Sequence, residues 1–310
     1  MNDQPGEKPV SNIQWRGVFP AVTTKLKADL SLDLDAIRGG LERLAESGVS
    51  GVVMMGMVGE NAQLSPEEKR TVLRTAVETL GGRVPVLSGV AETSTERAAA
   101  FAREAQSLGV DGLMVFPALT YKSDARETVE FYRSVARASA LPLLLYNNPR
   151  GYGVDLMPDI VEQLLAEPTI VAIKEESYDV TRVTDLVTRF GERLNVVCGV
   201  DDLVLESALL GSTAWVSGMA NALPRVSADL LSLALAGDFA KARALYRVLT
   251  PLYHLDTEVK LVQHIKLAEH MISGSSEAMK PPRLPLAGKE RERTMQVVRR
   301  TLEGLKAFGY

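Results

Sequence analysis

Residues 141–176, LPLLLYNNPRGYGVDLMPDIVEQLLAEPTIVAIKEE, contain the pattern from which we predict the fold. Two short apolar runs, Leu143–Tyr146 and Ile170–Lys174, flank an amphipathic segment, Pro158–Ala166. Strands that are apolar almost throughout, rather than alternating, are typical of parallel sheets buried on both faces. The stretch therefore predicts a strand, a helix and a second strand that runs parallel to the first.

The same alternation extends over most of the chain. The strand candidates are Gly17–Thr23, Gly51–Met55, Val84–Val90, Gly112–Phe116, Leu143–Tyr146, Ile170–Lys174, Asn195–Gly199 and Thr213–Ser217. The amphipathic segments that accompany them are Leu34–Glu46, Pro66–Thr79, Thr95–Leu108, Asp124–Ala138, Pro158–Ala166, Val180–Arg189, Asp202–Leu210 and Pro224–Leu235. Eight strand–helix units predict an α/β fold, a (β/α)8 TIM barrel. A doubly wound open sheet is the alternative, because it shows the same alternation.

Local signals support these helix limits. The stretch 65–68, Ser-Pro-Glu-Glu, combines a capping serine, a proline at the first helical position and acids in the first turn. Residues 94–96, Ser-Thr-Glu, begin a helix in a similar way. Glycines stand where four helices are expected to end, at Gly48, Gly109, Gly191 and Gly211.

Further helical runs follow the eighth unit and predict a C-terminal helical extension. They are Phe239–Leu249, Leu255–Ser273 and Glu290–Phe308. We therefore expect a flexible tail at residues 1–12, the barrel at 13–236 and the extension at 237–310. The tail is expected to be flexible because it is polar and has little to bury.

The composition excludes several classes of protein. Of the 310 residues, 46% are hydrophobic and 24% are charged, which is enough for a large core. The net charge of −4 argues against a nucleic-acid or anionic-membrane partner, since either would favour a basic excess. No apolar run approaches the ~18 residues of a membrane span, and the first residues lack the apolar core of a signal peptide. We expect a cytoplasmic enzyme with a small-molecule substrate.

Few residues could bind a metal. Cys198 is the only cysteine, which excludes an internal disulfide and a multi-cysteine metal site. The three histidines, His254, His264 and His270, fit none of the usual ligand spacings. We therefore expect neither a metal nor another cofactor.

Lys174 is the sharpest candidate for catalysis, because active sites of barrels form at the C-terminal ends of the strands. It ends an otherwise apolar strand. Burial disfavours the ammonium form and lowers the pKa of a lysine, which leaves a free amine able to attack a ketone. The alternative is a structural lysine that pairs with Glu175 or Glu176.

Tyr146 ends the preceding strand and is expected to lie next to Lys174 in the barrel. A phenol at that place could move protons at a reacting carbon. The alternative is an aromatic cap on the barrel core. Asn147, which follows, could hold the loop by bonding backbone groups.

Three loops could bind a substrate. Gly56 and Gly59, after the second strand, let the backbone turn tightly and present N–H groups to an anion, although an ordinary turn would look the same. Asp201 and Asp202, after the seventh strand, could hold substrate hydroxyls or cap the next helix. Residues 217–221, after the eighth strand, could add a backbone wall. Barrels often bind phosphate at these last loops, so a phosphorylated substrate is a further alternative.

Taken in order, these segments resemble the dihydrodipicolinate synthase / N-acetylneuraminate lyase family of Schiff-base barrels. The resemblance runs from about Gly17 to Leu305. It rests on Gly56-x-x-Gly59-Glu60, Tyr146-Asn147-x-Pro149, Ile173-Lys174-Glu175, Gly199-x-Asp201-Asp202 and Arg283-Leu284-Pro285-Leu286. In that family the lysine that matches Lys174 forms an imine with a 2-oxo acid, and the tyrosine that matches Tyr146 moves protons.

The resemblance also implies a binding site and an assembly. The Gly-x-x-Gly-Glu loop holds the substrate carboxylate in this family, and its relatives are commonly tetramers built from two dimers. The substrate-binding residues that we expect are Met57, Val58, Gly59, Gly199, Asp201, Val216 and Ser217. We likewise expect a homotetramer.

The chain departs from the synthases at three places. Met57 and Val58 replace the hydroxyl side chains of the carboxylate loop, so only backbone N–H groups remain. The tyrosine pair expected after Pro117 is absent, and the nearest tyrosine is Tyr121. The arginine that binds the second carboxylate is replaced by Gly151, with Arg150 one residue earlier. By contrast, Gly153 and the Asp201-Asp202 pair resemble the sugar-acid lyases.

We therefore predict a class I, metal-free lyase, an aldolase or dehydratase of a small hydroxylated 2-oxo acid. One alternative is a 4-hydroxy-tetrahydrodipicolinate synthase, which condenses pyruvate with aspartate semialdehyde. Another, of a different class, is a barrel that binds a 2-oxo acid without turnover.

Overall fold

Eight parallel strands form one sheet in the computed structural model, which describes residues 13–310. The strands are β1 (Gly17–Pro20), β2 (Val52–Met54), β3 (Val86–Val90), β4 (Gly112–Val115), β5 (Leu143–Asn147), β6 (Ile170–Glu175), β7 (Asn195–Cys198) and β8 (Ala214–Ser217). Their order is β1-β8-β7-β6-β5-β4-β3-β2, and a parallel bridge between Ala21 and Val53 joins the two ends of the sheet. This closure confirms the predicted TIM barrel and excludes the open doubly wound sheet. The tail expected at residues 1–12 lies outside the described residues.

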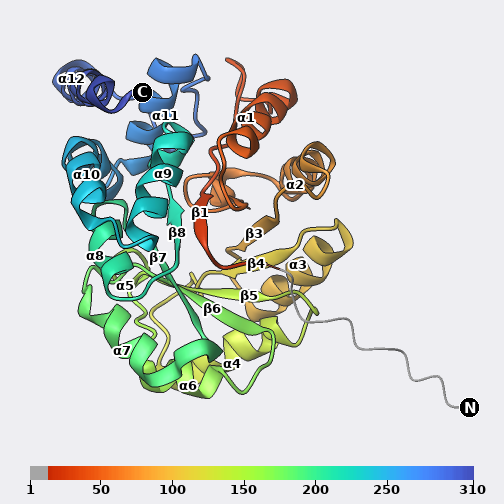
Figure 1. The fold of residues 1–310 in the computed structure, drawn as a ribbon. Coiled ribbons are helices and arrows are strands. Elements are labelled where there is room, and N and C mark those ends of the chain that lie inside the picture. The colour runs from red at the N-terminus through yellow and green to blue at the C-terminus, as the bar shows by residue number, and fades with distance from the viewer. Residues whose placement is uncertain (1–12) are drawn as a thin grey trace, which may run out of the picture.

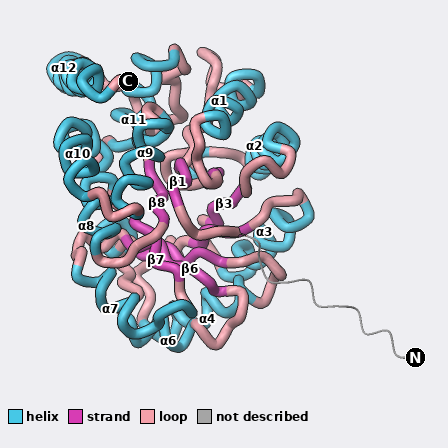
Figure 2. Tube along the Cα trace, viewed as in Figure 1, coloured by secondary structure: helices cyan, strands magenta, loops and turns pink. Residues whose placement is uncertain are grey.

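Helices surround the sheet on its outer side (Figures 1 and 2). Those that follow the strands are α1 (Leu34–Glu46), α2 (Pro66–Leu80), α3 (Thr95–Ser107), α4 (Ala125–Ala136), α6 (Pro158–Leu164), α7 (Thr181–Phe190), α8 (Val204–Leu209) and α9 (Pro224–Leu235). A further short helix, α5 (Pro149–Tyr152), directly follows β5 and was not predicted. Among residues 13–310, no helix combines the length and the apolar character needed to cross a bilayer.

The predicted helix ends are confirmed at atomic detail. The Ser65 hydroxyl accepts a hydrogen bond from the Glu68 N–H at 3.2 Å, and the Glu68 carboxylate accepts one from the Ser65 N–H at 2.8 Å. This capping box satisfies two N–H groups that the first turn of α2 leaves free. Gly48 and Gly109 follow α1 and α3 with φ of +81° and +87°, a conformation that a side chain would strain.

Successive side chains of each strand point alternately to the barrel interior and to the helix layer. On β5, Leu145 packs among the residues of the helix layer, whereas Leu144 and Tyr146 pack in the interior. On β6, Ala172 packs in the interior, so Lys174, two residues later, projects on the same side. The register of the two strands pairs Tyr146 with Lys174. The sequence period thus brings the amine and the phenol together at the C-terminal end of the barrel.

The chain continues after α9 with helices that pack on one another and on the barrel (Figure 1). They are α10 (Phe239–Tyr253), the 3-10 turn η5 (His254–Thr257), α11 (Leu261–Ser273) and α12 (Gly288–Leu305), which ends in η6 (Lys306–Phe308). α10 packs against α9 and α12, and α11 packs against α12. The predicted helical extension is therefore present.

Two predicted limits in this region were wrong. α10 does not end at Leu249 but continues through Pro251 to Tyr253, because Leu252 and Tyr253 are both fully buried. The expected helix Leu255–Ser273 is divided into η5 and α11. Glu258 is extended, with φ −84° and ψ 158°, and an extended residue interrupts a helix.

Two buried ion pairs connect α11 to the barrel. The Lys266 ammonium pairs with the Glu60 carboxylate, and both side chains are fully buried. The Lys25 ammonium lies 2.5 Å from the Glu269 carboxylate, and each of these side chains is 3% exposed. Because a buried charge without a partner is costly, α11 and the loops after β1 and β2 depend on each other.

We predict that Lys266→Met lowers the free energy of unfolding by about 3 to 5 kcal/mol, because it leaves the Glu60 carboxylate buried without its counter-charge. Lys306→Met is the matched control: its partner Glu303 and Lys306 itself are exposed, and we expect a change below about 0.5 kcal/mol. Urea unfolding of both variants measures the difference. Equal effects of the two substitutions would contradict the prediction.

Candidate active site

Lys174 lies in a small cavity of ≈ 30 Å³ at the C-terminal ends of the strands. The cavity is lined by Ala21, Gly56, Met57, Val58, Met114, Tyr146, Lys174, Glu176, Gly199, Val216, Gly218, Asp256 and Leu261. Most of these residues end or follow a strand, which is where barrels place their active sites. Asp256 comes instead from η5, between α10 and α11, and Leu261 is the first residue of α11.

The Lys174 ammonium forms an ion pair inside this cavity. Its Nζ lies 2.7 Å from Oε2 of Glu176, and the two side chains are 9% and 12% exposed. Burial by itself lowers the pKa of Lys174, but the adjacent Glu176 carboxylate, together with Asp256 and Tyr152, outweighs it and raises the pKa above its usual value. This corrects the expectation of a lowered pKa. The sequence argument considered burial alone, whereas the structure adds a counter-charge.

Tyr146 lies against Lys174, as the register requires. The Lys174 Nζ is 4.1 Å from the centroid of the Tyr146 ring. The Asn148 amide nitrogen donates to the Tyr146 hydroxyl at 3.2 Å and to Oε1 of Glu176 at 2.8 Å. Burial, together with the Glu176 charge, raises the pKa of Tyr146 well above its usual value. The phenol therefore keeps its proton at neutral pH.

Two asparagines hold the segment after β5. The Asn147 side-chain oxygen accepts a hydrogen bond from the Leu156 N–H at 2.8 Å, which is the loop-holding role suggested by the sequence. The Asn148 side-chain oxygen accepts one from the Gly151 N–H at 2.8 Å and caps α5. The amide of Asn148 thereby has a fixed orientation toward Tyr146 and Glu176.

Tyr152 is an aromatic neighbour of the site that the sequence analysis missed. Its ring centroid lies 5.6 Å from that of Tyr146 and 5.4 Å from that of Phe116. Burial raises the pKa of Tyr152, so it too is a neutral phenol. The asparagine followed by proline at 148–149 is typical of the start of a helix and could have predicted α5, which ends at Tyr152.

The glycine loop after β2 presents backbone to the cavity. Met57 and Val58, which we expect to bind the substrate, line it, and no hydrogen bond within residues 13–310 uses their N–H groups. Gly59, by contrast, does not line the cavity. It faces Val22, because a Cβ added to Gly59 would lie 3.0 Å from the Val22 carbonyl oxygen. The chain thus passes too close to Val22 for a side chain at this position.

The conformation of this loop is strained and held from outside. Met55 and Glu60, at its two ends, have φ of +57° and +58°, which is uncommon for residues other than glycine. The Glu60 carboxylate is bound by the Lys266 ammonium and by the Lys280 N–H at 2.8 Å. The buried ion pair therefore also fixes the loop that faces the cavity.

Asp201 and Ser217, which we expected to contact a substrate, lie behind the cavity wall. Both are fully buried and neither lines the cavity. The Asp201 carboxylate accepts hydrogen bonds from the Trp215 indole at 2.9 Å, the Ser217 hydroxyl at 3.0 Å and the Met219 N–H at 2.9 Å. Its oxygens are thus used in bracing the end of β8. Gly199 and Val216, also predicted, do line the cavity.

Asp256 is the second carboxyl group of the cavity, and the sequence analysis missed it. It belongs to η5, in the segment that was predicted as continuous helix. An added Cβ on Gly218 would lie 2.2 Å from its Oδ1, so the carboxyl group packs directly against the loop after β8. Burial, together with the nearby Asp201 and Glu176, raises the pKa of Asp256 well above its usual value.

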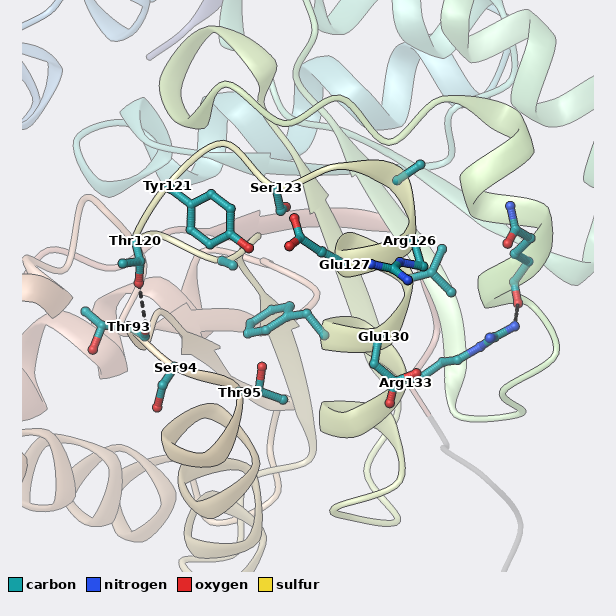
Figure 3. A pocket seen from close by; sticks show the side chains of 15 residues that line it. Thr93, Ser94, Thr95, Thr120, Tyr121, Ser123, Arg126, Glu127, Glu130 and Arg133 are labelled. Carbon is teal, nitrogen blue, oxygen red and sulfur yellow. Dashed lines mark hydrogen bonds between the residues drawn. The ribbon is translucent and has the colours of Figure 1, made fainter.

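Arg150 and Tyr121 do not line the cavity. Arg150 is exposed, and its guanidinium carbon lies 4.0 Å from the centroid of the Tyr178 ring. Tyr121 is 56% exposed and belongs to a separate groove of ≈ 980 Å³ between the start of α3 and α4 (Figure 3). None of the residues that line this groove lines the cavity of Lys174. Within residues 13–310, no group of three or more His, Cys, Asp or Glu residues is placed to hold a metal ion.

Comparisons with known proteins agree with this geometry. Residues 14–301 match the model of the dihydrodipicolinate synthetase family. A 4-hydroxy-tetrahydrodipicolinate synthase of Methanothrix thermoacetophila is 37% identical over 275 residues, which cover 88% of this chain and 91% of the relative. The structure of the enzyme of that name from Methylacidiphilum fumariolicum SolV is 29% identical with a TM-score of 0.91, over 94% of this chain and 97% of the other. A prophage protein of E. coli K12 from the dihydrodipicolinic acid synthase family, in complex with pyruvate, is 31% identical with a TM-score of 0.86, over 93% and 98% of the two chains.

We predict that Gly199→Ala disturbs Lys174. An added Cβ would lie 2.9 Å from the Lys174 Cε and 3.0 Å from the Glu175 carbonyl oxygen, so the lysine must shift. We expect formation of a borohydride-trapped adduct with pyruvate to slow by about 10- to 100-fold. Gly39→Ala is the control, because it lies in α1 and its added Cβ would meet no atom of residues 13–310 within 4 Å beyond its chain neighbours and the backbone of its own helix. Wild-type rates in both variants would contradict the close contact at Gly199.

Proposed function

The chain belongs to the dihydrodipicolinate synthetase family, and on that premise we propose that Lys174 is the amine that forms an imine with a 2-oxo acid. The protein is a Schiff-base-forming lyase of the class I aldolase type. The observation that carries the proposal is the position of Lys174: it ends β6, faces the barrel axis and lies against Tyr146 in a cavity.

The residues around Lys174 support each step of imine formation. The Glu176 carboxylate takes the ammonium proton, so that Nζ can attack the C2 carbonyl. The C2 oxygen needs two protons to leave as water: one comes from Nζ, and the neutral phenol of Tyr146 supplies the other. The proton that Glu176 took from the ammonium then restores the phenol. The free N–H groups of Met57 and Val58 bind the substrate carboxylate. Iminium nitrogen then withdraws electrons from the bonds at C3.

The charges of the cavity favour a hydroxylated 2-oxo acid as the substrate. Glu176 and Asp256 line it, and no arginine does so. A second carboxylate would be repelled by Glu176 and would lack a forked donor, whereas hydroxyl groups donate hydrogen bonds to carboxylates. We therefore propose an aldolase or dehydratase of such an acid.

A second candidate is 4-hydroxy-tetrahydrodipicolinate synthesis from pyruvate and aspartate semialdehyde. The names of the curated relatives favour it. In this activity Arg150 must leave the Tyr178 ring and bind the second carboxylate, because it is the cation next to the position where the synthases place their arginine.

We also propose a cytoplasmic homotetramer, a dimer of dimers, that binds neither nucleic acid nor membranes. The acidic balance of charge and the helices added outside the barrel support this proposal. Light scattering at micromolar concentration is expected to give four times the chain mass. A particle of 33.6 kDa would contradict it.

We predict that borohydride, added with pyruvate, leaves a stable adduct on Lys174. Reduction converts the imine to a secondary amine, which peptide mass spectrometry locates. Lys174→Arg should abolish both the adduct and turnover, because a guanidinium does not lose its proton at neutral pH. Lys122→Arg, at an exposed lysine that does not line the cavity, serves as the control. An unmodified wild-type protein would exclude the imine mechanism.

The substrate class is decided by a side-by-side comparison. We expect 2-oxo-3-deoxy sugar acids to be turned over and the condensation of pyruvate with aspartate semialdehyde to be slow. If condensation reaches a kcat/KM of ~10⁴ M⁻¹s⁻¹, an ordinary value for an enzyme on its own substrate, while the sugar acids stay inert, the second candidate is correct. Arg150→Ala should then abolish it.

A further inference from the structure

We propose that residues 254–260, which connect α10 to α11, form a strap that opens to admit the substrate and is latched by the hydrogen bond between His254 and Asp202. The inference rests on the proposed function, because it concerns the route by which a 2-oxo acid reaches Lys174. It adds a conformational step that precedes imine formation.

The cavity of Lys174 is too small for the substrate while the strap is closed. Its volume is ≈ 30 Å³. One water molecule needs ~10–15 Å³ of such a cavity, so there is room for about two of them. Pyruvate, a small 2-oxo acid, already contains three carbon and three oxygen atoms. Part of the cavity wall therefore has to move before Lys174 can attack a carbonyl group.

Most of the cavity wall is held in place by the barrel. The ends of β5 and β6 are in paired register, and the buried pair of Glu60 with Lys266 fixes the loop after β2. The Asn221 amide nitrogen donates to the carbonyl oxygens of Ala21 at 2.7 Å and Gly218 at 2.8 Å, and both of these residues line the cavity. Movement of these parts would break the sheet or a buried contact.

The strap is the part of the wall that lacks such anchors. It contributes Asp256 to the lining of the cavity. Within residues 13–310, no hydrogen bond or ion pair uses the Asp256 carboxyl group, whereas the Thr257 hydroxyl bonds back to the His254 carbonyl at 2.9 Å, inside the strap. Leu255 is buried and provides the apolar contact of the closed position. Nothing polar has to be broken to withdraw Asp256 from the cavity.

The first end of the strap is latched to the barrel. The His254 Nδ1–H donates to Oδ2 of Asp202 at 2.6 Å, and Asp202 belongs to the 3-10 turn η3 (Asp201–Leu203) after β7. The imidazole is 60% exposed, so water competes for this hydrogen bond. A contact of this kind orders the closed strap but opens readily, as a latch must.

The second end of the strap is the hinge. The Glu258 carboxylate lies 2.6 Å from the Arg293 guanidinium, and the Lys260 ammonium lies 2.6 Å from the Glu290 carboxylate. Both partners belong to α12, which packs against α10 and α11. Glu258 is extended and separates η5 from α11, so a change of its backbone angles swings the turn while α11 stays in place.

A reversible bridge across the latch tests the strap. The double variant Asp202→Cys/His254→Cys places two thiols at the pair, and a bis-methanethiosulfonate reagent with a short spacer joins them. We expect bridging to slow the formation of the pyruvate adduct by about 10-fold or more, because the strap then cannot open. The adduct is trapped with cyanoborohydride, which reduces iminium ions and spares disulfides. Dithiothreitol removes the bridge and should restore the rate.

Equal rates with and without the bridge would overturn the proposal. Methyl methanethiosulfonate modifies the same two thiols without joining them and should leave the rate within a few-fold; slowing equal to that of the bridge would assign the effect to bulk and would also overturn it. Arg225→Cys/Asp229→Cys is the matched control. It replaces a surface ion pair of 3.1 Å within α9, where a bridge leaves the strap free and should not change the rate.

The latch by itself is tested with His254→Ala. Loss of the hydrogen bond favours the open strap, so adduct formation at limiting pyruvate should be at least as fast as in wild type. A rate about 10-fold lower would show that the pair supports the site and would overturn its role as a latch. These failures differ from a failure of the proposed function, in which wild type would form no pyruvate adduct at all.

Discussion

The closed parallel ladder of strands is the constraint on which the rest of this structure depends. Closure gives each strand an inner and an outer face, and the two-residue period of a strand then decides which side chains meet inside. Lys174 and Tyr146 end neighbouring strands in paired register, so neither can move without its strand. The barrel therefore fixes the positions of Lys174 and Tyr146, and the other residues that line the cavity determine which chemistry it can perform.

Buried charge is handled in two different ways in this molecule. Lys266 with Glu60, and Lys25 with Glu269, are matched pairs that connect the barrel to α11. The cavity instead contains Lys174 with two carboxyl groups, Glu176 and Asp256. Within residues 13–310, Asp256 forms no side-chain ion pair, and buried carboxyl groups of this kind are candidates for proton transfer.

The barrel could be predicted from the sequence because its signals are local. Apolar runs, capping residues and helix-ending glycines are read within a few neighbours, and all eight predicted strands are present to within a few residues. The cavity is lined by four residues that the sequence singled out, because each ends or follows a strand: Lys174, Tyr146, Met57 and Val58.

The rest of the site could not be predicted from local signals. Asp256 reaches the cavity because an extended residue, Glu258, breaks a helix far along the chain, and periodicity does not reveal such a break. Asp201 was assigned to the substrate from its position in a loop, but three hydrogen-bond donors hold it behind the wall.

The buried ion pairs join residues 206 and 244 positions apart, and this separation has a consequence for folding during synthesis on the ribosome. A nascent chain that ends after α9 already contains Lys25 and Glu60 but not Glu269 or Lys266. Its eight strands can be complete while both ion pairs are still missing, so Lys25 and Glu60 gain their counter-charges only after α11 has been synthesised.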